Sequence, residues 1–302
     1  MKIKFWGVRG SYPVPGVGTN KYGGNTSCLE VRLDNGELII LDAGTGIRPL
    51  GKALIQNGFG QGKGHANILF THTHWDHIQG FPHFKPAYVE GNEFTIYARK
   101  QDHVTLKEVF AFQNGATYYP APLDAMKAKL NFKEIQAEQT LSVGGATVRT
   151  VRLNHPNIAL GYRIEADGKV FVYMTDTAPF EDMLIGSDFI PKPPEKIGEE
   201  EKRQLKELEM KLFSITENAD FVVYDAFFKM DEYKRNPHWG HSTPEHGAQM
   251  CLETGAKKIA LFHHAPSNTD DVMDQMEKYY EAQYRSEGVE VTVAMEGEEI
   301  PL

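Results

Sequence analysis

Ten short runs of apolar and β-branched residues recur along the chain. They lie at residues 3–8, 27–33, 37–44, 66–74, 94–99, 147–153, 161–166, 169–177, 220–228 and 258–266. Turn-forming residues, glycine above all, follow many of these runs. Runs of this length and composition are typical of β-strands. The sequence therefore predicts a chain that is rich in strands.

Five longer segments show the spacing of amphipathic helices. They cover residues 46–56, 105–113, 199–215, 242–255 and 270–288, and several of them end at a glycine, as helices often do. The strands come in runs and also alternate with helices. This order favours an α+β arrangement of two sheets packed on each other, with the helices outside, over a singly wound parallel sheet.

The composition is that of a globular protein. The chain has 302 residues, 41% hydrophobic and 24% charged, which is enough for one large domain or two small ones. We predict a single domain over residues 1–302. Its one clear change in composition is at residues 190–209, where a proline-rich segment runs into a charged helix. Within residues 178–215 we expect a lid or surface excursion, the alternative being a loop followed by a solvated helix.

Charge and cysteine content narrow the possible partners. The formal net charge of -9 disfavours long nucleic acids, because proteins that grip a phosphate backbone tend to have basic faces. Cys28 and Cys251 form no disulfide framework and no thiolate metal site. The sequence contains no uninterrupted apolar run long enough to cross a membrane. We therefore expect a cytoplasmic protein with no membrane partner.

The segment 67–81 concentrates titratable side chains directly after a predicted strand. His72 and His74, two positions apart in extended chain, project to the same side and can share one ion. If a helix begins near Trp75, then Asp76 and His77 return toward that point and offer an oxygen and a nitrogen to a second ion. Borderline divalent metals such as zinc accept this mixture, with metal to nitrogen distances of about 2.0 to 2.1 Å.

Three later strands also end in candidate ligands. His155 follows the run at 147–153, Asp176 lies at the end of 169–177, and the adjacent His263 and His264 follow the last run. A single polar residue at a strand end usually lies at the surface. Together with the 72–77 cluster, these residues instead predict a shared metal site.

This pattern resembles the metallo-β-lactamase superfamily, whose signature is the His-x-His-x-Asp-His string followed by a distant His, an Asp and a His. The resemblance covers essentially the whole chain and implies a four-layer αβ/βα sandwich with two divalent metal ions at one edge of its two mixed sheets. Zinc is the expected metal, with manganese or iron as alternatives. Asp42, in the string LDAGTG, would orient ligands. Of the two adjacent histidines, His263 is the expected ligand and His264 would line the pocket, the alternative being that His264 is the ligand. Position by position, the implied ligands are His72, His74 and His155 for the first metal, Asp76, His77 and His263 for the second, and Asp176 between them.

The string GHSTPE at residues 240–245 narrows the expected chemistry. Thr243 and Pro244 are typical of the start of a helix, which leaves His241 unexplained. The string resembles the histidine loop of the phosphodiesterase branch of the superfamily, which includes tRNA 3′-processing ribonucleases and small cyclic phosphodiesterases. The resemblance implies that His241 donates a proton to the leaving oxygen and that Asp225 orients it, although Tyr224 stands where the branch commonly has histidine. Asp76 would help to position the attacking hydroxide.

These features predict a metal-dependent phosphodiesterase that acts on a small diester such as a cyclic nucleotide. Arg9, Asn25 and Thr26, in a loop that resembles the opening loop of small bacterial hydrolases of this type, are expected at the pocket mouth. The aromatic residues predicted to stack on a base are Phe81, Phe84, Phe112 and Tyr118 or Tyr119. Alternatives are tRNA 3′-end processing, hydrolysis of a lactone, thioester or β-lactam, and a metal-binding sensor without activity. The resemblance also implies a homodimer.

Overall fold

Two seven-stranded mixed sheets form the centre of the molecule. The computed structural model describes residues 1–180 and 198–302. The first sheet has the order β14-β1-β2-β3-β4-β5-β6, with β3 to β6 parallel and the strands on the other side antiparallel. Its strands are β1 (Lys2–Gly7), β2 (Cys28–Arg32), β3 (Leu38–Leu41), β4 (His65–Leu69), β5 (Glu93–Arg99), β6 (Lys129–Ile135) and β14 (Glu299–Pro301).

The second sheet has the order β13-β12-β11-β10-β9-β8-β7. Its strands β10 to β13 run parallel, and the hairpins from β7 to β10 are antiparallel. Their bounds are β7 (Thr140–Val143), β8 (Ala146–Arg152), β9 (Leu160–Ala166), β10 (Lys169–Met174), β11 (Phe221–Asp225), β12 (Lys258–Phe262) and β13 (Glu290–Val293). Most candidate ligands follow the carboxyl ends of the parallel strands β4, β10 and β12, whereas His155 follows the antiparallel strand β8.

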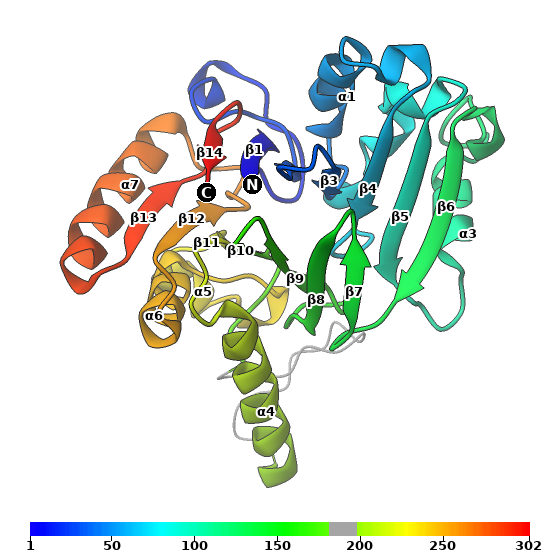
Figure 1. Ribbon diagram of the computed structural model, residues 1–302. Helices are drawn as coiled ribbons and strands as arrows, with labels where there is room; N and C mark the ends of the chain where they lie inside the picture. Colours follow the sequence, from blue (N-terminus) through cyan, green and yellow to red (C-terminus); the bar gives the residue numbers. More distant parts are fainter. Residues whose placement is uncertain (181–197) are drawn as a thin grey trace.

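Helices cover the outer face of each sheet (Figure 1). Helices α1 (Ile47–Ile55) and α3 (Leu106–Gln113) pack on the first sheet, and α4 (Glu199–Thr216), α6 (Pro244–Thr254) and α7 (Asp270–Tyr284) pack on the second. Two single-turn helices, α2 (Trp75–Ile78) and α5 (Met230–Tyr233), lie in loops. The molecule therefore has the predicted order of four layers, helices, sheet, sheet and helices.

Successive side chains of the central strands belong alternately to two apolar cores, one under the outer helices and one between the sheets. In β12, Ile259 and Leu261 belong to the apolar core under the outer helices, whereas Ala260 and Phe262 belong to the core between the sheets. Successive side chains of a strand point to opposite faces, so a strand buried on both sides is apolar at every position. This is why the central strands read as continuous apolar runs.

The two ends of the chain meet in the first sheet. Strand β14 pairs antiparallel with β1, with Ile300 opposite Ile3, and Figure 1 shows the N and C termini close together. The first sheet therefore contains both the first and the last strand of the chain. The core between the sheets also joins residues from the two halves of the sequence.

Helix α4 contains much of the charged segment singled out in the sequence. Leu205, Leu208 and Leu212 form a buried stripe on one side of α4, which contacts β8, β9 and α6. This part of the expected excursion is a packed outer helix. Residues 181–197 lie outside the described part of the chain. Among the helices of residues 1–180 and 198–302, none is long and apolar enough to cross a bilayer.

Within residues 1–180 and 198–302, all ten predicted strands are present, together with four strands that were not predicted. The four are β6, β7, β13 and β14, the strands at the edges of the two sheets. An edge strand pairs on one side only and is often short or charged. In β6, for example, only Ile135 is fully buried. Edge strands therefore give a weak apolar signal.

Candidate active site

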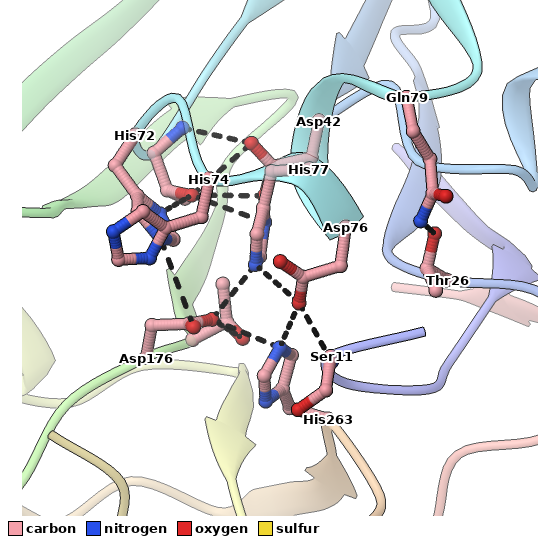
Figure 2. A network of polar contacts seen from close by, with 12 residues as sticks. Ser11, Thr26, Asp42, His72, His74, Asp76, His77, Gln79, Asp176 and His263 are labelled. Atoms are coloured by element: carbon pink, nitrogen blue, oxygen red, sulfur yellow. Dashed lines mark hydrogen bonds and ion pairs between the residues drawn. The ribbon is translucent and has the colours of Figure 1, made fainter. Parts of the chain in front are cut away.

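The loop between β4 and the end of α2 places four of the predicted ligands together. His74 has an extended backbone and α2 begins at Trp75, as expected from the sequence. The single turn buries Asp76 and His77 and leaves Trp75 exposed. This turn brings Asp76 and His77 back toward His72 and His74 (Figure 2).

The first group of ligand atoms consists of three imidazoles. One nitrogen of each of His72, His74 and His155 lies within 4.8 Å of the other two. His155 Nε2 is 3.1 Å from His74 Nδ1. The Nδ1 of His155 donates to the Gly240 carbonyl at 2.8 Å, which leaves the Nε2 lone pair facing the group.

The second group combines two carboxylates and two imidazoles. Asp76, His77, Asp176 and His263 are all buried, and their ligand atoms lie within 4.8 Å of one another. His263 Nε2 is 3.1 Å from both Asp76 Oδ2 and Asp176 Oδ1. Figure 2 shows these side chains converging from α2, the end of β10 and the end of β12.

Asp176 lies between the two groups. Its Oδ1 is 3.0 Å from His77 Nε2 in the second group. Its Oδ2 is 3.8 Å from His72 Nε2 and 3.7 Å from His155 Nε2 in the first. One carboxylate thus presents one oxygen to each group, the geometry of a bridging ligand.

Three strand ends share an uncommon backbone conformation. Asp42 follows β3 with φ 58°, Asp176 follows β10 with φ 58°, and His263 follows β12 with φ 57°. The left-handed region is uncommon for residues other than glycine and costs of order 1–3 kcal/mol. In each case it turns the side chain at the end of a buried strand toward the cluster.

Asp42 supports His77 from behind. Its Oδ2 accepts from His77 Nδ1 at 2.9 Å and from the Tyr173 hydroxyl at 2.9 Å, and its Oδ1 accepts from the Thr71 backbone N–H at 2.8 Å. These bonds hold the His77 ring with Nε2 directed at the second group. Asp42 therefore has the orienting position expected from the sequence.

Electrostatics differ between the groups. Burial lowers the pKa of His155 to about 3 and also lowers those of His72 and His74, so these three rings are neutral at neutral pH. Burial also acts to lower the pKa of His77, but the carboxylates of Asp176, Asp76 and Asp42 outweigh it and raise that pKa well above its usual value. The second group thus provides a concentrated negative field for a cation.

The donor set fits divalent metal ions. His72 Nε2 is buried and has no hydrogen-bond partner, and His77 Nε2 faces the carboxylates of Asp76 and Asp176 at 3.3 and 3.0 Å. A buried polar atom without a partner costs about 1–3 kcal/mol, a cost that a bound metal would remove. Neutral imidazole nitrogens and carboxylate oxygens suit zinc, manganese and iron.

His241 faces the same cluster from the loop before α6. Its Nδ1 donates to Asp225 Oδ2 at 2.9 Å, and its ring stacks on Phe227 with centroids 4.5 Å apart. Ligand atoms of His241, His155 and Asp176 lie within 4.8 Å of one another. Although burial opposes it, the carboxylate of Asp225 raises the pKa of His241. A buried imidazole with a raised pKa beside a metal-ligand cluster is suited to proton donation.

Comparison with known proteins identifies the fold family. The model of the β-lactamase superfamily domain matches residues 38–190, which is half of the chain. The chain belongs to the β-lactamase superfamily. Ribonuclease Z of Exiguobacterium sibiricum is 29% identical over 224 residues, covering 66% of this chain and 70% of that protein. Ribonuclease Z of Halobacterium salinarum is 24% identical over 282 residues, covering 87% and 86%.

Solved structures of the superfamily share the fold. The metallo-β-lactamase fold protein YhfI of Bacillus subtilis has a TM-score of 0.66 at 17% identity and covers 99% of this chain and 98% of its own. The short form of human tRNase Z has a TM-score of 0.62 at 17% identity, with 100% and 99% covered. The two mixed sheets with outer helices are thus the superfamily fold. The family match and the ribonuclease Z relatives make the chain a member of a hydrolase family. The superfamily match and the His and Asp groups described above indicate a site for divalent metals.

The structure corrects the expected substrate contacts. Arg9, Thr26 and His264 have no exposed surface. Arg9 donates to backbone carbonyls, Thr26 Oγ1 accepts from the side chain of Gln79, and His264 Nε2 donates to the Ala294 carbonyl. Asn25 is partly buried and donates from its side chain to Glu296 at 2.9 Å. These four residues fix loops around the site rather than line an open pocket, because each bonds to the protein and three of them have no exposed surface.

The aromatic residues divide between the core and the surface. Phe81 and Phe84 are fully buried in the core under α1 and α3, which removes them as stacking platforms. Phe112 and Tyr118 are exposed, and Tyr119 donates its hydroxyl to the Pro82 carbonyl.

Two exposed tryptophans lie next to candidate site residues in the sequence and were not predicted as site residues. Trp75 is 59% exposed between His74 and Asp76, and Trp239 is 45% exposed two positions before His241. Their position beside candidate site residues was visible in the sequence, but their exposure was not.

Proposed function

We propose that this chain is a dinuclear metal-dependent phosphodiesterase. The observation that carries the proposal is the His241–Asp225 pair beside the seven candidate ligands. In such a centre, two divalent ions about 3.5 to 4 Å apart would activate water and neutralise the phosphate. Attack on a phosphodiester also leaves an alkoxide that needs a proton. The pair would supply that proton, and the resemblance of GHSTPE at residues 240–245 to the histidine loop of the phosphodiesterase branch favours a phosphodiester over a lactone, thioester or β-lactam.

Different side chains would assist the attack of water and the departure of the leaving oxygen. His241, held protonated by Asp225, would give its proton from Nε2 to the leaving oxygen. Such a donor contributes about a hundredfold to ten-thousandfold in rate. Asp76, whose Oδ2 accepts from the Ser11 backbone N–H at 2.8 Å, would orient the attacking water. His72, His74 and His155 would hold one ion, Asp76, His77 and His263 the other, and Asp176 both.

The proposed substrate is a small phosphodiester such as a cyclic nucleotide. The net charge of -9 supports a small substrate over a long polyanion. Exposed Trp75, Trp239 and Phe112 are available to stack on a base, since stacking tolerates any base.

Processing of tRNA 3′ ends is the second candidate. It is favoured by the relatives named ribonuclease Z, which match this chain over most of its length. A small diester and a precursor tRNA would meet the same catalytic groups and differ in the surface that they contact.

A substrate panel tests both candidates. Metal-reconstituted protein is assayed with 3′,5′-cyclic nucleotides, linear dinucleotides, a precursor tRNA, a lactone and a thioester. We expect turnover of phosphodiesters, with cyclic nucleotides preferred. Preference for the precursor tRNA would establish the second candidate. Faster hydrolysis of the lactone or thioester than of every diester would refute a phosphodiesterase.

A further inference from the structure

The backbone of Gly10 packs directly against the ring of His263, a candidate ligand of the second group. A Cβ added to Gly10 would be 2.5 Å from Cε1 and 2.6 Å from Nδ1 of His263. Heavy atoms do not approach this closely, and the ring stands at the end of a buried strand with little room to move. The backbone of Gly10 therefore forms one wall of the space in which His263 is held.

The next residue, Ser11, contacts another ligand of the same group. The Ser11 backbone N–H donates to Asp76 Oδ2 at 2.8 Å, and the same oxygen is 3.1 Å from His263 Nε2 (Figure 2). Ser11 has φ 63°, so the chain turns sharply to direct this donor at the carboxylate. Two consecutive backbone positions thus contact two ligands of the second group.

Arg9 anchors this turn. Its fully buried side chain donates from Nε to the Gly23 carbonyl at 2.8 Å and from a terminal nitrogen to the Asn268 carbonyl at 2.6 Å. Backbone bonds in both directions join the turn to the residue after His263: Gly10 N–H donates to the His264 carbonyl, and His264 N–H donates to the Val8 carbonyl. The guanidinium therefore ties the turn to the loop that begins at His263.

We propose that Arg9, Gly10 and Ser11 form a positioning loop for the second metal site alone. The proposal rests on the dinuclear centre proposed above. The loop fixes the plane of His263 and the rotamer of Asp76, so that both are arranged before a metal arrives. The contacts of residues 9 to 11 described above do not include His72, His74 or His155.

The first group has a matching support of its own. A Cβ added to Gly240 would be 2.4 Å from His155 Nδ1, and Gly240 has φ 81°. Its carbonyl accepts from that same nitrogen at 2.8 Å. Gly10 and Gly240 are therefore a natural pair, each adjacent to one ligand ring of a different group.

The test counts zinc in variants of the full chain. Zinc-stripped protein is titrated with zinc by calorimetry, and bound zinc is measured by mass spectrometry. We expect two zinc ions per wild-type chain. In Gly10→Ala we expect the affinity of one site to fall about 10- to 100-fold, as is typical when the support of a ligand is lost. The other site should be unchanged.

Double variants show which site is lost. His77→Ala removes a ligand of the second group and His72→Ala one of the first. Gly10→Ala should add little to His77→Ala, because both act on one site, but should abolish tight binding when combined with His72→Ala. Gly240→Ala should show the reverse pattern.

A matched control and a second variant exclude general damage. Gly16, in the same N-terminal segment, has extended backbone, and a Cβ there would meet only Thr19 Oγ1 at 4.0 Å, so Gly16→Ala should bind zinc as the wild type does. Arg9→Lys keeps the positive charge but cannot span both carbonyls, so it should also weaken the second site alone. It carries the test if Gly10→Ala does not fold.

The outcomes separate the two proposals. Wild-type affinity at both sites of Gly10→Ala would overturn the positioning loop and leave the dinuclear centre intact. Loss of both sites in Gly10→Ala, with the zinc-free chain folded, would also overturn it. One zinc or none in the wild type would overturn the dinuclear centre itself.

Discussion

The two ligand groups of the site are built in different ways. The first draws two of its three members from one loop, His72 and His74, and all three of its imidazoles are neutral. The second draws on α2 and the ends of two strands of the second sheet, and it contains two carboxylates. The arrangement of the first group is therefore determined mainly by local sequence, whereas the arrangement of the second depends on the packing of the two sheets. The two carboxylates therefore belong to the group whose residues come from more separate elements of the fold.

The largest expected effect comes from the residue that joins the groups. Asp176→Ala removes the oxygens that face both groups, so we expect loss of tight binding at both sites. The fall in affinity should exceed the 10- to 100-fold loss that is typical of removing a supporting residue. Metal analysis and calorimetry check this result. Retention of one full site would mean that Asp176 belongs to a single group.

Loss of the proposed proton donor should leave both groups intact. His241→Ala is expected to lower kcat about a hundredfold to ten-thousandfold with unchanged metal content. A diester with a p-nitrophenolate leaving group is the control, because that group departs without a proton and should be less affected. Equal losses on alkoxide and p-nitrophenolate substrates would contradict the role.

Breaking the support of one group should affect the other group less. Asp42→Asn removes the charge that holds His77, and we expect a loss of about 10- to 100-fold in affinity at the second site. The first site should lose less affinity, because Asp42 bonds His77 directly and reaches His72 only through the Thr71 hydroxyl. Calorimetric titration separates the two, and equal weakening of both would show that the groups are coupled.

The pH dependence of turnover tests the electrostatics of His241. Its pKa is raised, so the protonated form persists to higher pH and is lost as pH rises through that pKa. Asp225→Asn removes the stabilising charge and should lower this pKa, which moves the basic limb of the kcat profile to lower pH. A basic limb that does not move would assign it to another group.

The smallest effect is expected at an exposed side chain whose sequence neighbours are candidate ligands. Trp75 lies between His74 and Asp76 in the sequence, and Trp75→Ala should raise KM for a nucleotide diester. The loss corresponds to about 1–3 kcal/mol if one base stacks on the ring. Tyr279→Ala, which removes an equally exposed aromatic from α7, is the control. Equal KM changes in both variants would exclude stacking on Trp75.

Much of the fold could be predicted from the sequence, because apolar runs mark strands that are buried on both faces. The central strands β10, β11 and β12 were all found, and the four edge strands were not, because half of an edge strand faces solvent. The candidate ligands could also be named, since each follows such a run. The roles expected of Arg9, Thr26 and His264 were corrected because burial and backbone contacts depend on distant parts of the chain.

The sequence alone determined the chemistry of the donors and the spacing of His72, His74, Asp76 and His77, since one loop and one helical turn fix their order. Only the tertiary structure decided that Asp176 presents one oxygen to each group and that Gly10 presses on His263. Those relations join residues that follow different strands and lie far apart in the sequence, and they exist because two sheets pack face to face and bring the ends of their strands to one edge.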